Sequence, residues 1–541
     1  MGRFMDTEKN ASVTAERRAS NAERRASIVH DPDAGHLTNQ EDHEKSKWQA
    51  IKSHPWAFAW CLFGVWLSLL VSFENQAAGI VIGIPQFRKD FGSFYEGNYV
   101  LPAKWQSAFS GAPVAATAIG ALTAGQIADW IGRKRTVMAF LVVSWIGVTM
   151  EFISTTNELF FGGKFVNGFA VGTLAALGTT YVGEIAPLAL RGILTAIIAL
   201  AYTVGPLCAA LILNDTGTME NRWAYRAVFV SQYGFAAVAS IAVFFMPESP
   251  WWLANKGKDE QALRSLRGLG YNKGDEDVKR LALIKLTLEQ IKRETENATY
   301  LECFRRSNLR RTIISIAPLE IQALGGVIWV AGYSTYYIQL AGYSTAMSFK
   351  LFIALQVVSM FGNVCSWFLV DKVGRRNLTL WGVTILTVLL MVAGGLASAG
   401  SPGAIKAAIG LITVYGFFYN ITIGATAYNL LAEVSTSRLR IKTIAIGLAL
   451  QNLTYMMWSF VLPYLFNPDK ANLGAKVTFI FGGISILCII YLWFYQVETA
   501  NRSYAELDEM FAKRIPARKF KTYVTDEQRM GQEVKRKSIG A

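Results

Sequence analysis

The chain is poor in the residues on which most enzyme and metal sites depend. Only four of its 541 residues are histidines, and all four lie in the first 55 residues. Its five cysteines do not have the paired spacing of a zinc site. The sequence contains no phosphate-binding loop and no pairing of a nucleophile with a base. It therefore predicts neither an enzyme nor a protein that holds a metal or another cofactor.

Charged residues are scarce as well. They make up 17% of the chain, against about 25% in a typical soluble domain. Hydrophobic residues make up 52%, and apolar runs of about 20 residues recur, each long enough to cross the roughly 30 Å core of a bilayer. The net charge of +14 reflects basic residues in short loops beside these runs, a pattern of cytoplasmic loops and not of nucleic-acid binding. The sequence predicts an all-α protein whose main partner is the lipid bilayer.

Twelve membrane-spanning helices are predicted, six in each half of the chain. The predicted spans cover residues 56–83, 106–128, 136–155, 161–183, 193–214 and 225–246 in the first half, and 313–341, 348–370, 379–399, 407–432, 444–466 and 476–496 in the second. The chain thus divides into an N-terminal tail, a first bundle, a linker, a second bundle and a C-terminal tail, over residues 1–55, 56–246, 247–312, 313–496 and 497–541.

The polar segments are interpreted from their composition. We expect the N-terminal tail to be disordered, and the C-terminal tail to be disordered beyond about residue 515. Apolar residues recur at helical spacing in the linker, which predicts short amphipathic helices under both bundles. The loops richest in Lys and Arg share a side with the linker and both termini, so this side is predicted to be cytoplasmic. No cleavable signal peptide is visible, and the first span is expected to insert the chain into the cell membrane.

Charged motifs repeat between the two halves. Asp129 and Gly132 recur as Asp371 and Gly374, at offsets of 371 − 129 = 242 and 374 − 132 = 242 residues. An acidic residue followed seven positions later by an arginine also recurs, with an offset of 433 − 184 = 249 residues; the members of these two pairs are Glu184, Arg191, Glu433 and Arg440. The chain is therefore predicted to be an internal duplication, as in many transporters.

These motifs resemble the sugar porter family of the major facilitator superfamily. The segments that carry the resemblance are 125–135, 181–192, 223–226, 247–253, 370–376 and 431–440. The sequences Pro-Glu-Ser-Pro-Trp-Trp-Leu at 247–253 and Gly-Tyr-Ser-Thr-Tyr at 332–336 look most like the fungal maltose and α-glucoside permeases. After the last span, Val-Glu-Thr-Ala-Asn-Arg at 497–502 departs from the Pro-Glu-Thr-Lys-Gly-Arg of that family. The resemblance implies two pseudo-symmetric six-helix bundles that alternate access to a central site.

The resemblance also implies an ionic latch between helices that closes the cytoplasmic side when the cavity faces outward. Its predicted members are Asp129, Arg133, Glu184, Arg191, Asp371, Arg375, Glu433 and Arg440. The alternative is that these residues only anchor helix ends at the membrane surface.

Three charged residues that stand out lie within the predicted spans. They are Glu74 in the first, Lys164 in the fourth and Glu320 in the seventh. A charge at this depth costs at least about 2.5–3.5 kcal/mol on insertion scales, so it usually has a partner and a function. Glu74 and Lys164 keep the sign of an Asp and an Arg in proton-coupled sugar porters. We hypothesise that Glu74 binds the coupling proton and Lys164 is its counter-charge, with a static buried ion pair as the alternative. For Glu320 three roles stay open: a second proton site, a solute ligand, and a side chain near the wet end of the span.

Polar residues in the second half are predicted to bind the solute, with hydrogen bonding between helices as the alternative. They are Gln322, Ser359, Asn363, Tyr428, Gln451 and Asn452. Three positions depart from the family: Ala199 stands for Gln or Asn, Val327 for Asn and Ala425 for Pro. The cavity has therefore lost a sugar ligand in its first half, which favours a less hydroxylated solute as an alternative to a sugar.

The sequence thus predicts a plasma-membrane transporter that takes up a sugar of the α-glucoside, maltose or hexose kind together with protons. A proton-driven exporter of a small polar metabolite is the alternative. A non-transporting nutrient sensor is a third reading, against which the short C-terminal tail argues. In the N-terminal tail, Ser20 and Ser27 each follow a pair of arginines and are candidate phosphorylation sites. Asn214 opens a glycosylation triplet that we expect to lie too close to the bilayer to be used.

Overall fold

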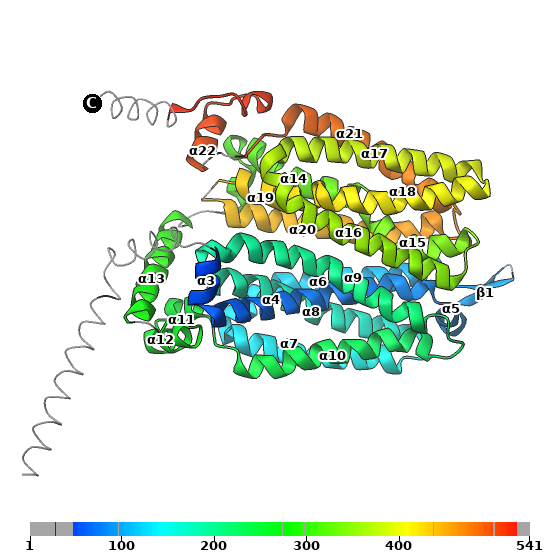
Figure 1. The fold of residues 1–541 in the computed structure, drawn as a ribbon, viewed down its shortest axis with the longest axis horizontal. Helices are drawn as coiled ribbons and strands as arrows, with labels where there is room; N and C mark the ends of the chain where they lie inside the picture. The colour runs from blue at the N-terminus through cyan, green and yellow to red at the C-terminus, as the bar shows by residue number, and fades with distance from the viewer. Residues whose placement is uncertain are drawn as a thin grey trace, which may run out of the picture.

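The computed structural model describes residue 28 and residues 47–526, except for residues 96, 273, 296–298, 437, 501 and 503. Twelve helices of this described part are long and apolar enough to cross a membrane. Figure 1 shows them in two groups, with the first half of the chain below and the second half above. The predicted all-α membrane fold of two bundles is confirmed. Ser20 and Ser27 lie outside the described residues.

The spans of the first half agree with the predicted ranges to within about four residues at each end. They are α4 (Pro55–Ile80), α6 (Ala103–Ile131), α7 (Arg133–Ile153), α8 (Asn157–Ile185), α9 (Arg191–Thr216) and α10 (Trp223–Phe245). The connection from α4 to α6 contains η1 (Val81–Gly83), α5 (Pro85–Phe91) and a hairpin of β1 (Ser93–Tyr95) and β2 (Asn98–Val100). The two strands are antiparallel, with Ser93 opposite Val100. A short helix, η2 (Leu188–Leu190), precedes α9.

The second half repeats this arrangement with two divided spans. Its helices are α14 (Arg306–Leu324) with α15 (Val327–Leu340), α16 (Thr345–Val373), α17 (Arg375–Ala399), α18 (Pro402–Ile421) with α19 (Ile423–Val434), α20 (Arg440–Phe466), and α21 (Val477–Tyr495) after η4 (Gly474–Lys476). Helix α14 begins at Arg306, although the sequence assigned residues up to 312 to the linker. The polar first turns of α14 are helical because their side chains find partners; Arg311, for example, donates to the backbone carbonyl of Ser435.

Each divided span interrupts the helical hydrogen bonding of the backbone within the second bundle. Gly326 has a φ of 89°, in the left-handed region, and separates α14 from α15. Thr422, with φ −114° and ψ −101°, separates α18 from α19. Tyr415 donates to the carbonyl of Gly325 at 2.6 Å, which satisfies one group that the break releases. Discontinuous helices of this kind commonly form the solute region of transporters.

The linker helices pack under the first bundle, except the last, which contacts the second. They are α11 (Pro250–Asn255), α12 (Asp259–Gly268), α13 (Glu276–Thr295) and η3 (Tyr300–Phe304). Leu266, Val278 and Leu281 are buried in one apolar core with residues of the first half. Glu302, in η3, pairs with Arg438 of the second half at 3.3 Å, so the linker reaches both bundles while its amphipathic helices lie under the first.

The C-terminal segment covers the second bundle in the same way. It forms α22 (Tyr504–Ala512) and η5 (Ala517–Lys519), and Phe520 is fully buried in a cluster with Ile314 and Val434. The expected disorder beyond residue 515 is wrong for the described residues, which extend to 526. At the other terminus, α3 (Lys47–Ser53) buries Ala50 against the first bundle, so the expected disorder of the tail is wrong for this part as well. In both segments a few apolar side chains are enough to dock a polar sequence.

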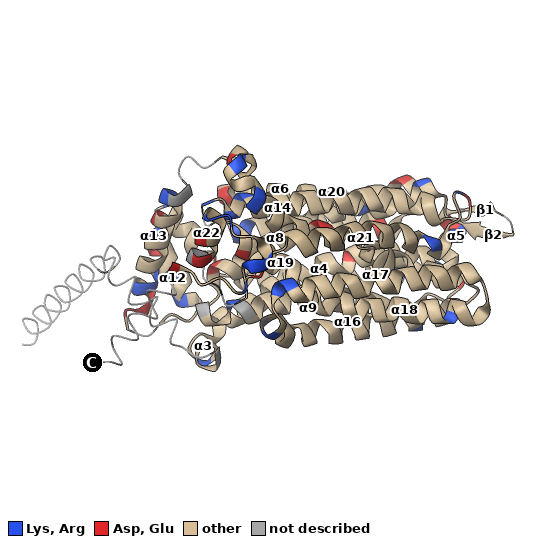
Figure 2. Cartoon of the chain, turned by 90° about the horizontal axis from the view of Figure 1, so that it is seen from above, with Lys and Arg blue, Asp and Glu red and all other residues tan. Residues whose placement is uncertain are grey.

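The two ends of the molecule differ in charge and closure. We call the end with α3, α11–α13 and α22 the linker end, and the end with α5, β1 and β2 the hairpin end (Figure 1). Figure 2 shows Lys and Arg gathered mainly at the linker end. At the hairpin end, side chains join the two halves: Gln106 donates to Asn467 at 2.9 Å, and Gln339 donates to the carbonyl of Gly83 at 2.6 Å. Arg88 also donates to Gln339, at 3.0 Å.

The turns between α6 and α7 and between α16 and α17 each require a glycine. Gly132 and Gly374 have φ values of 97° and 92°, where a side chain is strained. A Cβ at Gly132 would also collide with the carboxylate of Glu248, and one at Gly374 with that of Glu498. Two separate constraints, the backbone angle and the close carboxylate, thus select glycine at both turns.

Replacing Gly132 with Ala should therefore destabilise the first bundle. We expect a loss of about 1–3 kcal/mol from the strained backbone angle and the displaced carboxylate, measured as a lower midpoint of thermal unfolding in detergent. Gly125→Ala is the matched control, since this helical glycine in α6 has open space around it, and there Ala should be neutral or stabilising. Equal midpoints for the two variants would contradict the account of the turn.

Candidate functional site

A cluster of three charged side chains lies inside the first bundle. Lys164, on α8, has its Nζ 2.9 Å from Oε1 of Glu74 on α4 and 3.0 Å from Oε2 of Glu151 on α7. All three side chains are 0% exposed. The structure thus brings together the two residues that the sequence paired, Glu74 and Lys164, and adds a second carboxylate.

Amide side chains surround the two carboxylates. Gln232, on α10, donates to Oε2 of Glu74 at 2.8 Å. Asn167 donates to Oε1 of Glu151 at 3.2 Å and to Oε1 of Gln232 at 3.0 Å, and it accepts from Ser144 at 2.9 Å. One hydrogen-bonded network therefore joins α4, α7, α8 and α10.

The charges of this cluster do not balance if every member is ionised. Two carboxylates and one ammonium group leave one excess negative charge in surroundings of low dielectric, where an uncompensated charge is expensive. The Lys164 ammonium also faces the rings of Phe160 and Phe229, with 5.6 and 4.7 Å from Nζ to the ring centroids. Binding one proton would neutralise the cluster, and this is the chemistry that the arrangement offers.

Glu151 is not among the residues predicted from the sequence. It falls inside the predicted third span, 136–155, and the same argument that selected Glu74 applies to it. Gln232 and Asn167 carried no comparable signal, because polar amides within spans usually join helices.

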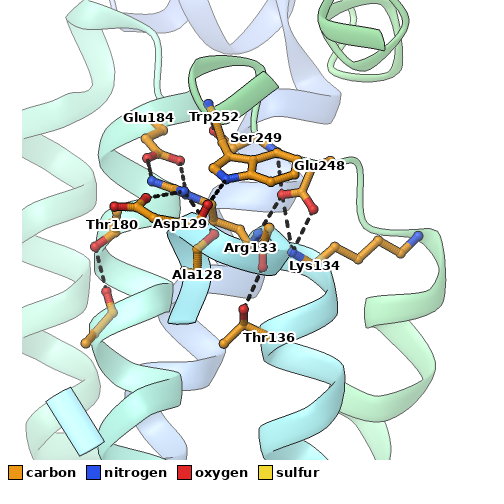
Figure 3. A network of polar contacts seen from close by, with 12 residues as sticks. Ala128, Asp129, Arg133, Lys134, Thr136, Thr180, Glu184, Glu248, Ser249 and Trp252 are labelled. Atoms are coloured by element: carbon orange, nitrogen blue, oxygen red, sulfur yellow. Dashed lines mark hydrogen bonds and ion pairs between the residues drawn. The ribbon is translucent and has the colours of Figure 1, made fainter. Parts of the chain in front are cut away.

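A second network lies at the linker end of the first bundle, where Figure 3 shows it around the turn between α6 and α7. The guanidinium of Arg133 lies 2.8 Å from Glu184 and 2.9 Å from Asp129. Glu248 accepts from the backbone N–H groups of Arg133 at 2.8 Å and of Lys134 at 3.2 Å. These N–H groups begin α7, so the carboxylate stabilises both free donors and the helix dipole.

The second bundle repeats this network. Arg375 lies 3.2 Å from Glu433, and its backbone N–H donates to Glu498 at 2.9 Å. Glu498 corresponds to Glu248 at an offset of 498 − 248 = 250 residues. The segment 497–502, which departs from the family sequence, therefore keeps the carboxylate that caps α17. That offset, close to the two found in the sequence, was the signal that could have identified both acids.

Three further predicted latch residues lie at the ends of their helices. Arg191 and Arg440 are the first residues of α9 and α20. The side chain of Asp371 lies outside those that the structure describes. The latch contacts given above, Arg133 with Glu184 and Arg375 with Glu433, each join helices of the same half.

Three predicted solute ligands form one chain of hydrogen bonds in the second bundle. Gln451, on α20, donates to Oε1 of Gln322 on α14 at 2.6 Å, and it accepts from the hydroxyl of Tyr428 on α19 at 3.3 Å. Both glutamines are buried, whereas Tyr428 is 50% exposed. Nearby, Oε2 of Glu320 accepts from Thr454 at 2.8 Å.

The other three predicted ligands lie elsewhere on their helices. Ser359 and Asn363 are buried on α16, and Ser359 packs so closely on α18 that a Cβ at Gly416 would meet its hydroxyl at 2.6 Å. Asn452 donates to the carbonyl of Leu448 in its own helix at 2.9 Å. These contacts resemble helix packing, the alternative that the sequence left open.

Comparison with known proteins agrees with this geometry. Residues 60–511 match the family model described as sugar (and other) transporter. The general alpha-glucoside permease of Saccharomyces cerevisiae is 28% identical over 506 residues, covering 91% of this chain and 81% of the permease. A maltose permease of the same species is 30% identical over 489 residues, covering 88% of this chain and 79% of the permease.

Two solved structures of XylE from E. coli share the fold. The inward open conformation of this xylose transporter has a TM-score of 0.67, with 19% identity over 84% of this chain and 99% of that one. The proton:xylose symporter XylE bound to 6-bromo-6-deoxy-D-glucose has a TM-score of 0.64, with 20% identity over 84% and 99% of the two chains.

Removing the ammonium of the buried cluster should cost more stability than any surface change. We expect Lys164→Met to destabilise the protein by about 3–5 kcal/mol, because it leaves two carboxylates buried without a cation. Thermal unfolding in detergent measures this loss. Lys256→Met, at an exposed linker position, is the control and should change stability by less than about 0.5 kcal/mol. A Lys164→Met protein as stable as this control would show that the three groups are not electrostatically coupled.

Proposed function

The chain belongs to the sugar (and other) transporter family, and from this premise we propose that it takes up a sugar together with protons by alternating access. The names of its relatives support the solute class, since they are permeases of α-glucosides and maltose. The proposal for proton coupling rests on one observation, the buried cluster in which Glu74 and Glu151 share Lys164.

The cluster is suited to hold one proton on its pair of carboxylates. Glu74 accepts hydrogen bonds from both Lys164 and Gln232, which stabilises its charged form. Oε2 of Glu151 is buried near the ammonium but accepts no hydrogen bond from the described residues. The excess proton is therefore best placed on Glu151 in this conformation. The two carboxylates share one ammonium group, so a change in the contacts of either one alters whether the proton stays bound.

Helix α4 links this cluster to the second half. Gln76, two residues after Glu74, donates to the carbonyl of Ala331 on α15 at 3.0 Å. When the hairpin end opens, this bond must break and α4 must shift relative to α15. A shift of α4 carries Glu74 with it and changes its distance to Lys164, which connects proton binding to the movement of the halves.

Sidedness follows from charge. The linker end holds most of the basic residues (Figure 2), and we place it, with both termini, in the cytoplasm of a cell whose plasma membrane the protein spans. The hairpin end, closed by the bonds between the halves, then faces outward. The structure corresponds in this proposal to an inward-facing state.

Transport of maltose by the purified protein in lipid vesicles tests the proposal directly. We expect labelled maltose to exchange into vesicles preloaded with unlabelled maltose, and to accumulate when the pH outside is lower than inside. Vesicles preloaded with mannitol in place of maltose give the background uptake. Accumulation of maltose only when the pH inside the vesicles is the lower one would show that solute enters as protons leave. That result would instead support the alternative of proton-driven efflux.

Glu74→Gln should separate proton coupling from solute movement. We expect the variant to lose accumulation against a gradient while it keeps exchange of maltose, because the neutral amide removes the need for a bound proton. The two rates are measured in the same vesicles. Glu158→Gln is the control, since Glu158 lies exposed at the start of α8 and should retain both activities. Uphill accumulation that survives in Glu74→Gln would remove Glu74 from the coupling mechanism.

A further inference from the structure

Two tyrosines, one from each half, keep much of their surface exposed within the spans. Tyr202 on α9 is 46% exposed and Tyr428 on α19 is 50% exposed. The hydroxyl of Tyr428 donates to the buried Gln451 at 3.3 Å, so this ring is turned toward the interior of the second bundle. Its exposed surface therefore borders an internal space, called here the tyrosine-lined space.

Glu320 lies beside the same group of aromatic side chains. It is partly exposed on α14, and its Oε2 accepts from Thr454 on α20. Thr454 and Gln451, which accepts from Tyr428, lie three residues apart on one face of α20. The carboxylate is therefore part of the tyrosine-lined space and not of the lipid-facing surface.

No cation of the protein balances this carboxylate. Among the residues that the structure describes, Lys164 pairs with Glu74 and Glu151, and no basic side chain is recorded within ion-pair distance of Glu320. Its Oε1 is buried and has no hydrogen-bond partner in the described part of the chain. An ionised carboxylate at membrane depth usually has a counter-charge, and none of the described residues supplies one to Glu320.

We propose that Glu320 binds a positively charged nitrogen of the solute, so that the transported class includes polyhydroxylated amines such as amino sugars. The tyrosines supply aromatic faces that favour an ammonium group. Gln322 and Gln451 supply amide groups for hydroxyls about one helical turn away, since Gln451 and Thr454 lie three residues apart on one face of α20. This inference rests on the proposed transport function and narrows its solute. It also fits the loss of a sugar ligand where Ala199 stands on α9.

A matched pair of ligands tests the charge alone. N-methylglucamine carries a protonated amine, and glucitol is a neutral polyol of the same chain length. Binding to the purified protein in detergent, measured by the shift of thermal unfolding with ligand concentration, should be about tenfold tighter for N-methylglucamine, because a charge-assisted hydrogen bond replaces a neutral one. The preference should disappear in Glu320→Gln and remain in Glu320→Asp, which keeps the charge.

Vesicle transport then separates this inference from the proposed function. N-methylglucamine should inhibit maltose exchange in the wild-type protein about tenfold better than glucitol, and this difference between the two inhibitors should disappear in whatever maltose exchange Glu320→Gln retains. Equal binding of the two polyols by the wild-type protein would overturn the inference while maltose transport stands. If the wild-type protein shows no preference for the amine and Glu320→Gln loses proton-driven accumulation, Glu320 belongs to proton coupling. That result would overturn the inference as well. Amine-selective binding without any maltose transport would instead sink the proposed function and keep the binding site.

Discussion

The sharing of one ammonium group by two buried carboxylates is the constraint on which the first bundle depends. Lys164 has no exposure, and neither do its partners Glu74 and Glu151, so each group relies on the others in place of water. The contact demands close helices: a Cβ at Gly147 would lie 2.6 Å from the backbone nitrogen of Asn167. The absence of a side chain there lets α7 approach α8 and brings Glu151 to the lysine. The close packing holds the backbone of the cluster in place, whereas the number of protons that the cluster binds can change.

The repeated turns give each half its own rigidity at the linker end. In both halves a left-handed glycine leaves space for a carboxylate, which caps the next helix, while an arginine pairs with an acid on a third span. Helices α11–α13 of the linker then dock on the first half and the C-terminal segment on the second. Each of these segments stiffens a single half, whereas η3, at the end of the linker, joins the second half through Glu302 and Arg438.

The sequence predicted what depends on composition and repetition. Length of apolar runs gave twelve spans, and two charged motifs at nearly equal offsets gave the duplicated halves and the arginine–acid pairs at 133 and 375. The errors arose where a few contacts outweigh composition. Helix α3 and the C-terminal segment are polar on average, yet Ala50 and Phe520 dock them. Glu151 was overlooked, although it sits in an apolar run, because no motif of the resembled family drew attention to it. Which glutamines meet could not be read at all, since Gln322 and Gln451 lie 451 − 322 = 129 residues apart and only packing of α14 on α20 joins them.

In the proposed mechanism, proton binding and solute binding are divided between the halves, and the route from one to the other is short. The buried cluster belongs to α4, α7, α8 and α10, whereas Gln322 and Glu320 belong to α14. Helix α4 touches α15 through Gln76 and Ala331, and α15 is separated from α14 only by the break at Gly325 and Gly326. A continuous helix would transmit any shift of α15 directly to the solute ligands, but a left-handed glycine lets the two segments change their angle. The carbonyl of Gly325, held by Tyr415 at 2.6 Å, fixes α14 to α18 while α15 follows α4. In the proposed mechanism, the break in the seventh span thus lets the hairpin end rearrange with the state of the proton site while the solute ligands on α14 keep their positions.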